Sequence, residues 1–141
     1  MNHERILEHF ASRVLALGVT GVTKSDIHLP NRKFERNDRD LWFEISVGEG
    51  EPLNWTEESD RRLITVNVIT AVPTGSGTSR LNNIAEKVSR LYSPAVSGRA
   101  GFVIEDSRFD VRSVSKYPAD NSTEGTKINV RFVLDKITKE L

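Results

Sequence analysis

The sequence has 141 residues, a length typical of a single domain, and we expect one domain over residues 1–141. Lys plus Arg and Asp plus Glu each number 20, so the formal net charge is zero, which argues against a general nucleic-acid binder with its usual basic excess. No apolar run approaches about 18 residues, so no membrane span is expected. The lack of cysteine excludes disulfides, thiolate metal sites and a cysteine nucleophile.

Charge is segregated along the chain. Residues 1–60 hold 7 Lys or Arg and 12 Asp or Glu, a net charge of −5, whereas residues 61–141 hold 13 and 8, a net charge of +5. Either this segregation is chance that folding mixes again, or copies of the molecule pair an acidic patch with a basic one.

An amphipathic helix is predicted for residues 3–17. Its apolar side chains recur at intervals of three or four from Ile6 to Leu17, which places them on one face. Gly18 is placed to end the helix. A charged connection follows, with a short extended piece at about 26–29.

The next elements are a strand and an acidic segment. Residues 41–47 alternate apolar and polar side chains, which predicts a half-buried strand. Residues 48–60 contain five acidic side chains, two Gly and one Pro, so we expect an exposed, mobile, hairpin-like acidic loop at about 48–60. Within it, Trp55 is either held against the domain surface or left available to a partner.

The rest of the chain predicts a second helix among strands. β-Branched residues that alternate with period two predict a strand, and apolar residues at helical spacing then predict a helix whose N-cap is Thr78. The expected strands are 61–72, 101–106, 108–116 and 126–137, and the expected helix is 79–92. Residues 117–126 are of the types favoured in turns, so we expect a turn there. The fold class is therefore α+β, a mostly antiparallel sheet with two main helices packed on it.

No motif in the sequence predicts a reaction. The glycine-rich loop at 73–80 lies between a strand and a helix, where phosphates bind, but it has no Lys and lacks the spacing of known nucleotide-binding loops. His3 and His9 lie about 120° apart on the first helix, which does not favour a shared metal ion. We expect no enzyme activity, no catalytic residue, no cofactor and no metal.

Four arginines form a band on the later strands: Arg61, Arg62, Arg108 and Arg112. The band is either an ordinary solvated sheet face, or a charged surface that meets another subunit or lines a lumen near DNA. Aromatic residues do not alternate with these cations, as a single-strand binding platform would require.

The order of elements resembles a known family. A first amphipathic helix precedes the strand ITVNVITAVP, a Gly-rich break, the helix RLNNIAEKVSRLY and the terminal strand INVRFVLDK. Over most of the chain this order is similar to that of the tail terminator, or tail completion, proteins of long-tailed bacteriophages and prophages. Proteins of that family have no catalytic residues and assemble as a ring, usually a hexamer, which stops growth of the tail tube and joins it to the head.

The resemblance implies a structural protein in the virion tail, present in the host cytoplasm during assembly. Its partners are itself, the major tail tube protein and the head–tail connector, while DNA only passes through the ring lumen. The predicted interface residues are Glu49, Glu51, Trp55, Glu57, Glu58, Arg61, Arg62, Arg108 and Arg112. The alternatives are another head–tail joining or minor tail protein, or a small ligand-binding protein that uses the 73–80 loop.

Overall fold

The computed structural model describes residues 3–30, 34, 39–55, 59–92, 101–105 and 107–139, with the backbone alone at 49–55, 59–62 and 137–139. In chain order the elements are helix α1 (His3–Ala16), the 3-10 turn η1 (Lys24–Asp26), strands β1 (Ile27–His28), β2 (Trp42–Trp55) and β3 (Ser59–Val72), helix α2 (Ser79–Ser89), and strands β4 (Gly101–Ile104), β5 (Ser107–Lys116), β6 (Asp120–Ser122) and β7 (Gly125–Lys139).

Helix α1 confirms the first prediction to within one residue. Ile6, Phe10 and Val14 are almost fully buried, because their spacing places them on the face turned toward the sheet. Gly18 has φ 69° and its N–H donates to the Leu15 carbonyl oxygen at 3.1 Å. Glycine adopts this left-handed conformation without steric cost, so the chain turns away from the helix there.

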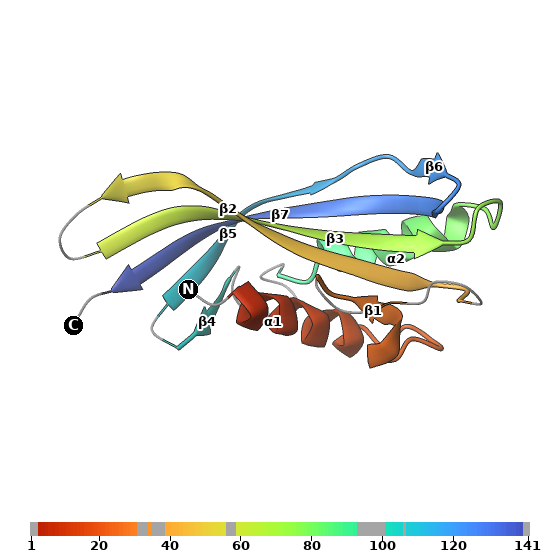
Figure 1. Ribbon diagram of the computed structural model, residues 1–141, viewed down its shortest axis with the longest axis horizontal. Helices are drawn as coiled ribbons and strands as arrows, with labels where there is room; N and C mark the ends of the chain where they lie inside the picture. The colour runs from red at the N-terminus through yellow and green to blue at the C-terminus, as the bar shows by residue number, and fades with distance from the viewer. Residues whose placement is uncertain are drawn as a thin grey trace.

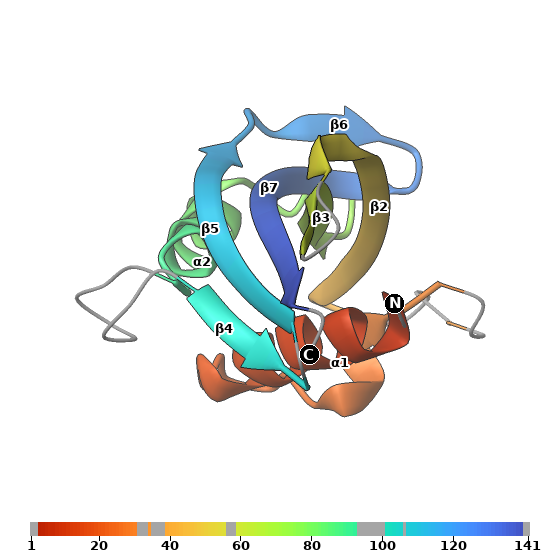
Figure 2. The ribbon, with the colours of Figure 1, turned by 90° about the vertical axis from the view of Figure 1, so that its left-hand side faces the viewer.

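The strands form one mixed sheet in the order β1–β2–β3–β7–β5–β4, with β6 paired to β7. Strands β1 and β2 are parallel, and every other described pair is antiparallel. Figure 1 shows the strong twist of this sheet, and Figure 2 shows how its strands curl above helix α1. The fold is therefore α+β with a mostly antiparallel sheet and two described helices packed on it, as predicted.

The prediction of a hairpin-like loop at 48–60 is wrong in part, because most of the segment belongs to two paired strands rather than to a loop. Strand β2 continues to Trp55 and β3 begins at Ser59, with Glu49 opposite Ile64 and Trp55 opposite Asp60. Backbone hydrogen bonds to β3 do not depend on side-chain polarity, and β7 supports β3 from its other side, so a polar segment is kept in the ladder. Residues 56–58 lie outside the described residues, and the mobility of the segment stays a prediction.

Helix α2 ends three residues before the end of the helix predicted from its apolar spacing. It ends at Ser89, although Leu91 and Tyr92 remain buried in the turn that follows. Thr78 occupies the predicted N-cap position, but its hydroxyl makes no capping hydrogen bond. Instead, its carbonyl oxygen accepts the backbone N–H and the side-chain amide of Asn82 at 2.8 and 2.9 Å.

The strands of the last third form as predicted, with one addition. Strands β5 and β7 pair antiparallel, and the polar segment between them carries the short strand β6, which also pairs with β7. This segment is therefore in part strand rather than turn. Strand β4 pairs with the first four residues of β5 and lies at one edge of the sheet.

One face of the sheet and both helices form the hydrophobic core. Alternate residues of β3, Ile64, Val66 and Val68, are fully buried, and they lie opposite Leu134, Phe132 and Val130 of β7. Helix residues from α1 and α2 belong to the same buried cluster. No described helix is both long and apolar enough to cross a membrane.

Candidate functional site

The sheet face opposite the core carries a cluster of polar side chains, and we name it the open face. It carries Asn67 on β3 with Asn129 and Arg131 on β7. The side-chain amide of Asn129 donates to Asn67 Oδ1 at 3.0 Å, and Arg131 Nε donates to the same oxygen at 3.2 Å. The Arg131 guanidinium also lies over the Tyr117 ring, 5.3 Å from its centre.

An ion pair joins two strands near the end of this face. Lys127 Nζ lies 3.0 Å from the Glu44 carboxylate, which also accepts the Trp42 indole N–H at 2.9 Å. Burial raises the pKa of Glu44, but the hydrogen bonds from Trp42 and Lys127 and the Lys127 charge outweigh burial and leave the pKa below its ordinary value. Glu44 is therefore already engaged within the molecule.

A second surface follows strand β5 and the edge of the sheet, and we name it the basic edge. It contains the large hydrophobic side chains that are exposed among the described residues, which are Val103, Val114 and Tyr117 at 52%, 37% and 39% exposure. It also contains three cations of β5: Arg108, Arg112 and Lys116. Val103 lies opposite Arg108 at the start of β5, whereas Val114 and Tyr117 lie near its other end, so these side chains are spread along the strand. Exposed apolar side chains and arginines are both enriched at protein–protein interfaces.

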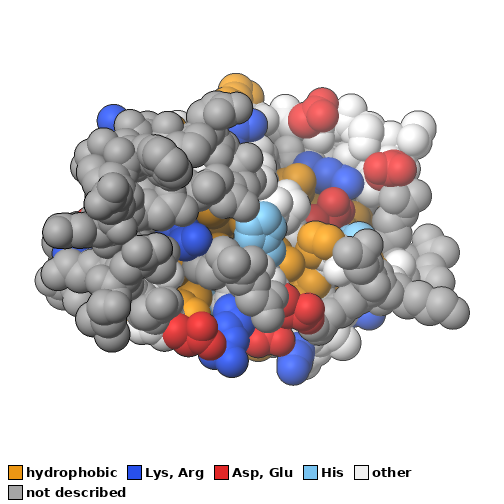
Figure 3. Space-filling model, turned by 60° about the vertical axis from the view of Figure 1, so that its left-hand side comes forward, with side chains coloured by type: hydrophobic (Ala, Val, Ile, Leu, Met, Phe, Trp, Pro, Cys, Tyr) orange, Lys and Arg blue, Asp and Glu red, His pale blue; other side chains and the backbone are white. Residues whose placement is uncertain are grey.

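The cations of the basic edge differ in how far they are neutralised. Arg108 Nε lies 3.3 Å from the Asp110 carboxylate, and Lys116 Nζ lies 3.3 Å from Glu86 on α2. Arg112 is exposed and pairs with no acidic side chain among the described residues. Figure 3 shows one face of the molecule, on which hydrophobic and histidine side chains are visible between acidic and basic ones.

A β-bulge sets the position of Arg112. Val111 lies opposite Leu134 and Ser113 opposite Val133, so Arg112 is the extra residue of β5 with no partner on β7. Bulges redirect a side chain and interrupt pairing at a sheet edge. The bulge therefore presents one unneutralised cation at the edge of the sheet.

Only part of the predicted interface is brought together. Arg108 and Arg112 lie on β5 and are exposed, as the interface hypothesis requires. The backbone places five more residues on β2 and β3, with their side chains outside the description: Glu49, Glu51, Trp55, Arg61 and Arg62. Glu57 and Glu58 lie outside the described residues.

Sequence reasoning missed the apolar part of the basic edge. Val114 and Tyr117 are ordinary residues of a strand pattern, and their exposure depends on where β4 stops covering β5. The pairing of Tyr117 with Arg131 is equally non-local, because the two residues meet only through the β5–β7 pairing. The one available indication was Pro118, since proline is confined to edge strands and turns.

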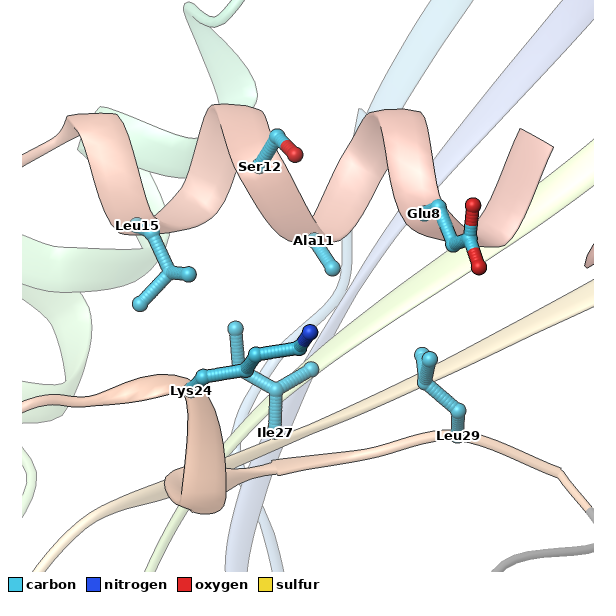
Figure 4. Close-up of a pocket in the computed structure, with 7 residues that line it drawn as sticks. All are labelled: Glu8, Ala11, Ser12, Leu15, Lys24, Ile27 and Leu29. Atoms are coloured by element: carbon cyan, nitrogen blue, oxygen red, sulfur yellow. The ribbon is translucent and has the colours of Figure 1, made fainter. Parts of the chain in front are cut away.

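A groove lies between α1 and the η1–β1 segment (Figure 4). It has a volume of about 340 Å³, at the lower end of the range for small-molecule sites. Its lining residues are Glu8, Ala11, Ser12, Leu15, Lys24, Ile27 and Leu29. Figure 4 shows Lys24 reaching across toward α1. Nothing in the structure shows what fills this groove.

The loop that the ligand-binding alternative requires is an exposed turn. Ser76 N–H donates to the Pro73 carbonyl oxygen at 3.1 Å, and Gly75 and Gly77 both have positive φ. Thr74 Oγ1 donates to the Ser122 carbonyl oxygen at 2.6 Å, which holds the turn against β6. The side chains at 74–80 are all exposed.

His9 packs among aromatic rings beside the core. Its ring stacks on Phe102 with a centre-to-centre distance of 4.0 Å, and its Nε2 is buried with no hydrogen-bond partner among the described residues. Burial, helped by the nearby Arg13 charge, lowers the pKa of His9 to about 4. In the described part of the chain, no three His, Asp or Glu side chains gather as a metal site would need.

No protein-family model matches the sequence, and neither does any curated protein. A solved structure whose name states no function is similar to this chain, with a TM-score of 0.65 and 15% sequence identity over 96% of each chain. A likeness at this level of identity shows the fold alone.

Proposed function

We propose that this chain is a structural assembly protein, a tail terminator of a long-tailed bacteriophage or prophage. In this role it forms a homo-oligomeric ring on the end of the tail tube, stops tube growth and joins the tube to the head. The resemblance in element order supports this proposal, and the α+β fold agrees with what that resemblance implies.

The observation that carries the proposal is the basic edge. Exposed apolar residues and arginines follow one another along this edge of the sheet, an arrangement suited to contact with another protein. A small-molecule site instead needs a cavity with convergent polar groups, and the groove found among the described residues lies between α1 and the η1–β1 segment rather than at the basic edge. Assembly therefore fits this surface better than binding of a small ligand.

The test is polymerisation of purified tail tube protein from the same phage genome, with and without this chain. The proposal expects the tubes to stop growing, with a ring visible at one end by negative-stain electron microscopy. Tubes that grow without limit at saturating amounts of the chain would overturn it. Binding along the tube or to the head connector without arrest of growth would instead favour another head–tail joining or minor tail protein.

A further inference from the structure

A row of polar side chains crosses the open face from strand to strand. Four residues stand directly opposite one another from β2 through β3 and β7 to β5: Ser46, Asn67, Arg131 and Ser115. Residues that lie directly opposite in antiparallel strands share a face of the sheet, with Cβ atoms about 5 Å apart. The four side chains therefore form one continuous row, which we name the Arg131 row.

The guanidinium of Arg131 is held from two sides. Its Nε donates to Asn67 Oδ1 at 3.2 Å, and its Cζ lies 5.3 Å from the centre of the Tyr117 ring. Asn67 is itself fixed by the hydrogen bond from the Asn129 amide at 3.0 Å. These contacts leave the two terminal nitrogens of Arg131, Nη1 and Nη2, without a hydrogen-bond partner among the described residues. The end of the planar guanidinium is thus oriented and available.

The charge of Arg131 is not neutralised by any acidic side chain in the described part of the chain. Glu44 is the acid in the rows on either side of it, and Lys127 and the Trp42 indole already engage that carboxylate. The other members of those two rows are uncharged: Gly48, Thr65, Val133, Ser113, Ile69, Asn129 and Tyr117. Arg131 is therefore a single cation among uncharged neighbours on this part of the open face.

From this geometry we infer that the open face binds a protein partner through a carboxylate, an Asp or Glu side chain that Arg131 receives. The two terminal nitrogens of a guanidinium match the two oxygens of a carboxylate in parallel hydrogen bonds. The exposed Ser115 hydroxyl lies beside Arg131 in the row and offers a further donor. The inference goes beyond the proposed function and does not depend on it, because it concerns a face of the sheet and not the assembly of a ring.

The surroundings of Arg131 favour a carboxylate over a nucleic-acid backbone. Binding to a phosphate chain depends on several cations that neutralise successive phosphates, and the three rows around Arg131 offer one unpaired cation. The chain as a whole also has a formal net charge of zero. One planar cation is suited to one planar anion.

The shape of the surface favours a protein over a free small molecule. Small-molecule sites are cavities, and the groove among the described residues lies elsewhere, between α1 and the η1–β1 segment. A protein can cover an open sheet face and place one carboxylate on it. The exposed Tyr117 ring beside Arg131 then supplies contact area, and tyrosine and arginine are enriched among the residues that dominate binding energy.

Arginine side-chain NMR of the full chain at neutral pH tests the site with acetate as the probe. The Nε–Hε signal of Arg131 is followed during the titration, and that of Arg112 is the internal control, because Arg112 is exposed and has no acidic partner among the described residues. The dissociation constant for acetate should be at least about tenfold lower at Arg131, since its guanidinium is already oriented. Equal constants at the two arginines would overturn the inference.

A short peptide with one Glu between leucines represents the protein partner. It should bind at Arg131 more tightly than acetate, because it also covers the Tyr117 ring, and the same peptide with Gln in place of Glu should lose this binding. A Glu peptide that binds no better than acetate would mean an adventitious ion only and would overturn the inference. A short oligothymidylate that binds Arg131 more tightly than the Glu peptide would also overturn it, in favour of nucleic acid.

Two substitutions separate the shape of the guanidinium from its charge, with binding followed by the backbone amide signal of Tyr117. Arg131→Lys keeps the charge but removes the paired donors, so the Glu peptide should bind at least about fivefold more weakly. Asn67→Ala removes the acceptor of Nε and should weaken binding about threefold.

Arg112→Lys is the matched control, because it makes the same exchange at an exposed arginine outside the Arg131 row. This control should bind the Glu peptide like the wild type, and circular dichroism should show all three variants folded. An Arg131→Lys variant that binds the peptide as tightly as the wild type would refute the role of Arg131. Tube capping is scored separately, so neither result decides the terminator proposal.

Discussion

Acidification tests the environment of the His9 ring. The ring stacks on Phe102 and lies 5.9 Å from the Tyr92 ring, and its buried Nε2 has no partner among the described residues. Burial and the Arg13 charge lower the pKa of His9 from 6.5 to about 4 in the folded protein. The unfolded chain therefore binds a proton more readily than the folded one between these values, so folding stability falls as the pH drops.

The size of the effect follows from the two pKa values of His9. The full difference corresponds to at most about 3.4 kcal/mol of the free energy of unfolding, of which about 2 kcal/mol is lost by pH 5. Because solvent still reaches part of the ring, we expect a loss of about 1 to 2 kcal/mol. The part of the free energy of unfolding that depends on a neutral His9 is fully present above about pH 6.5 and is lost below about pH 4.

Urea unfolding at pH 7.5 and pH 5 measures this loss in the wild type and in His9→Phe. Phenylalanine keeps the stack on Phe102 but does not titrate, so the variant should lose about 1 to 2 kcal/mol less than the wild type. Equal losses in the wild type and His9→Phe, or a His9 pKa near 6.5 by NMR titration, would refute the reasoning.

Four other substitutions have defined outcomes. Phe10→Ala should lower the free energy of unfolding by about 3 to 5 kcal/mol in urea titration, because the ring is fully buried. Gly125→Ala should cost about 1 to 3 kcal/mol, since φ is +132° and a new Cβ lies 2.8 Å from a backbone carbonyl oxygen. Gly48→Ala, with open space around it and no positive φ, should cost well under that. Lys127→Met should raise the pKa of Glu44, measured by NMR, because it removes the ion pair at 3.0 Å.

Local periodicity predicts most elements of this fold. The helical stripe from Ile6 to Val14 and the alternation from Ile64 to Val68 both identify the residues that are buried. These patterns work because each element must present one apolar face to the same core. Composition was a poorer guide at 48–60, because strand pairing depends on the neighbouring strand and not on the polarity of the paired residues.

The candidate interface was less predictable than the fold. The sequence alone identified Arg108 and Arg112 as exposed cations on a strand and showed that the two halves of the chain differ in charge. It did not identify Tyr117, because the exposure of that ring depends on a strand edge that no local pattern marks. Nor did it identify the bulge at Arg112, which exists only relative to the register of β7.

The amino-acid sequence by itself determined both helices and most of the strands, which of their faces are apolar, and that charge is segregated along the chain. Those properties follow from side-chain chemistry over a few neighbouring residues. The tertiary structure alone decided that β3 and β7 separate β2 from β5 in the sheet. Strand order and register are set by contacts between residues far apart in the chain, where burial of the shared core selects one pairing.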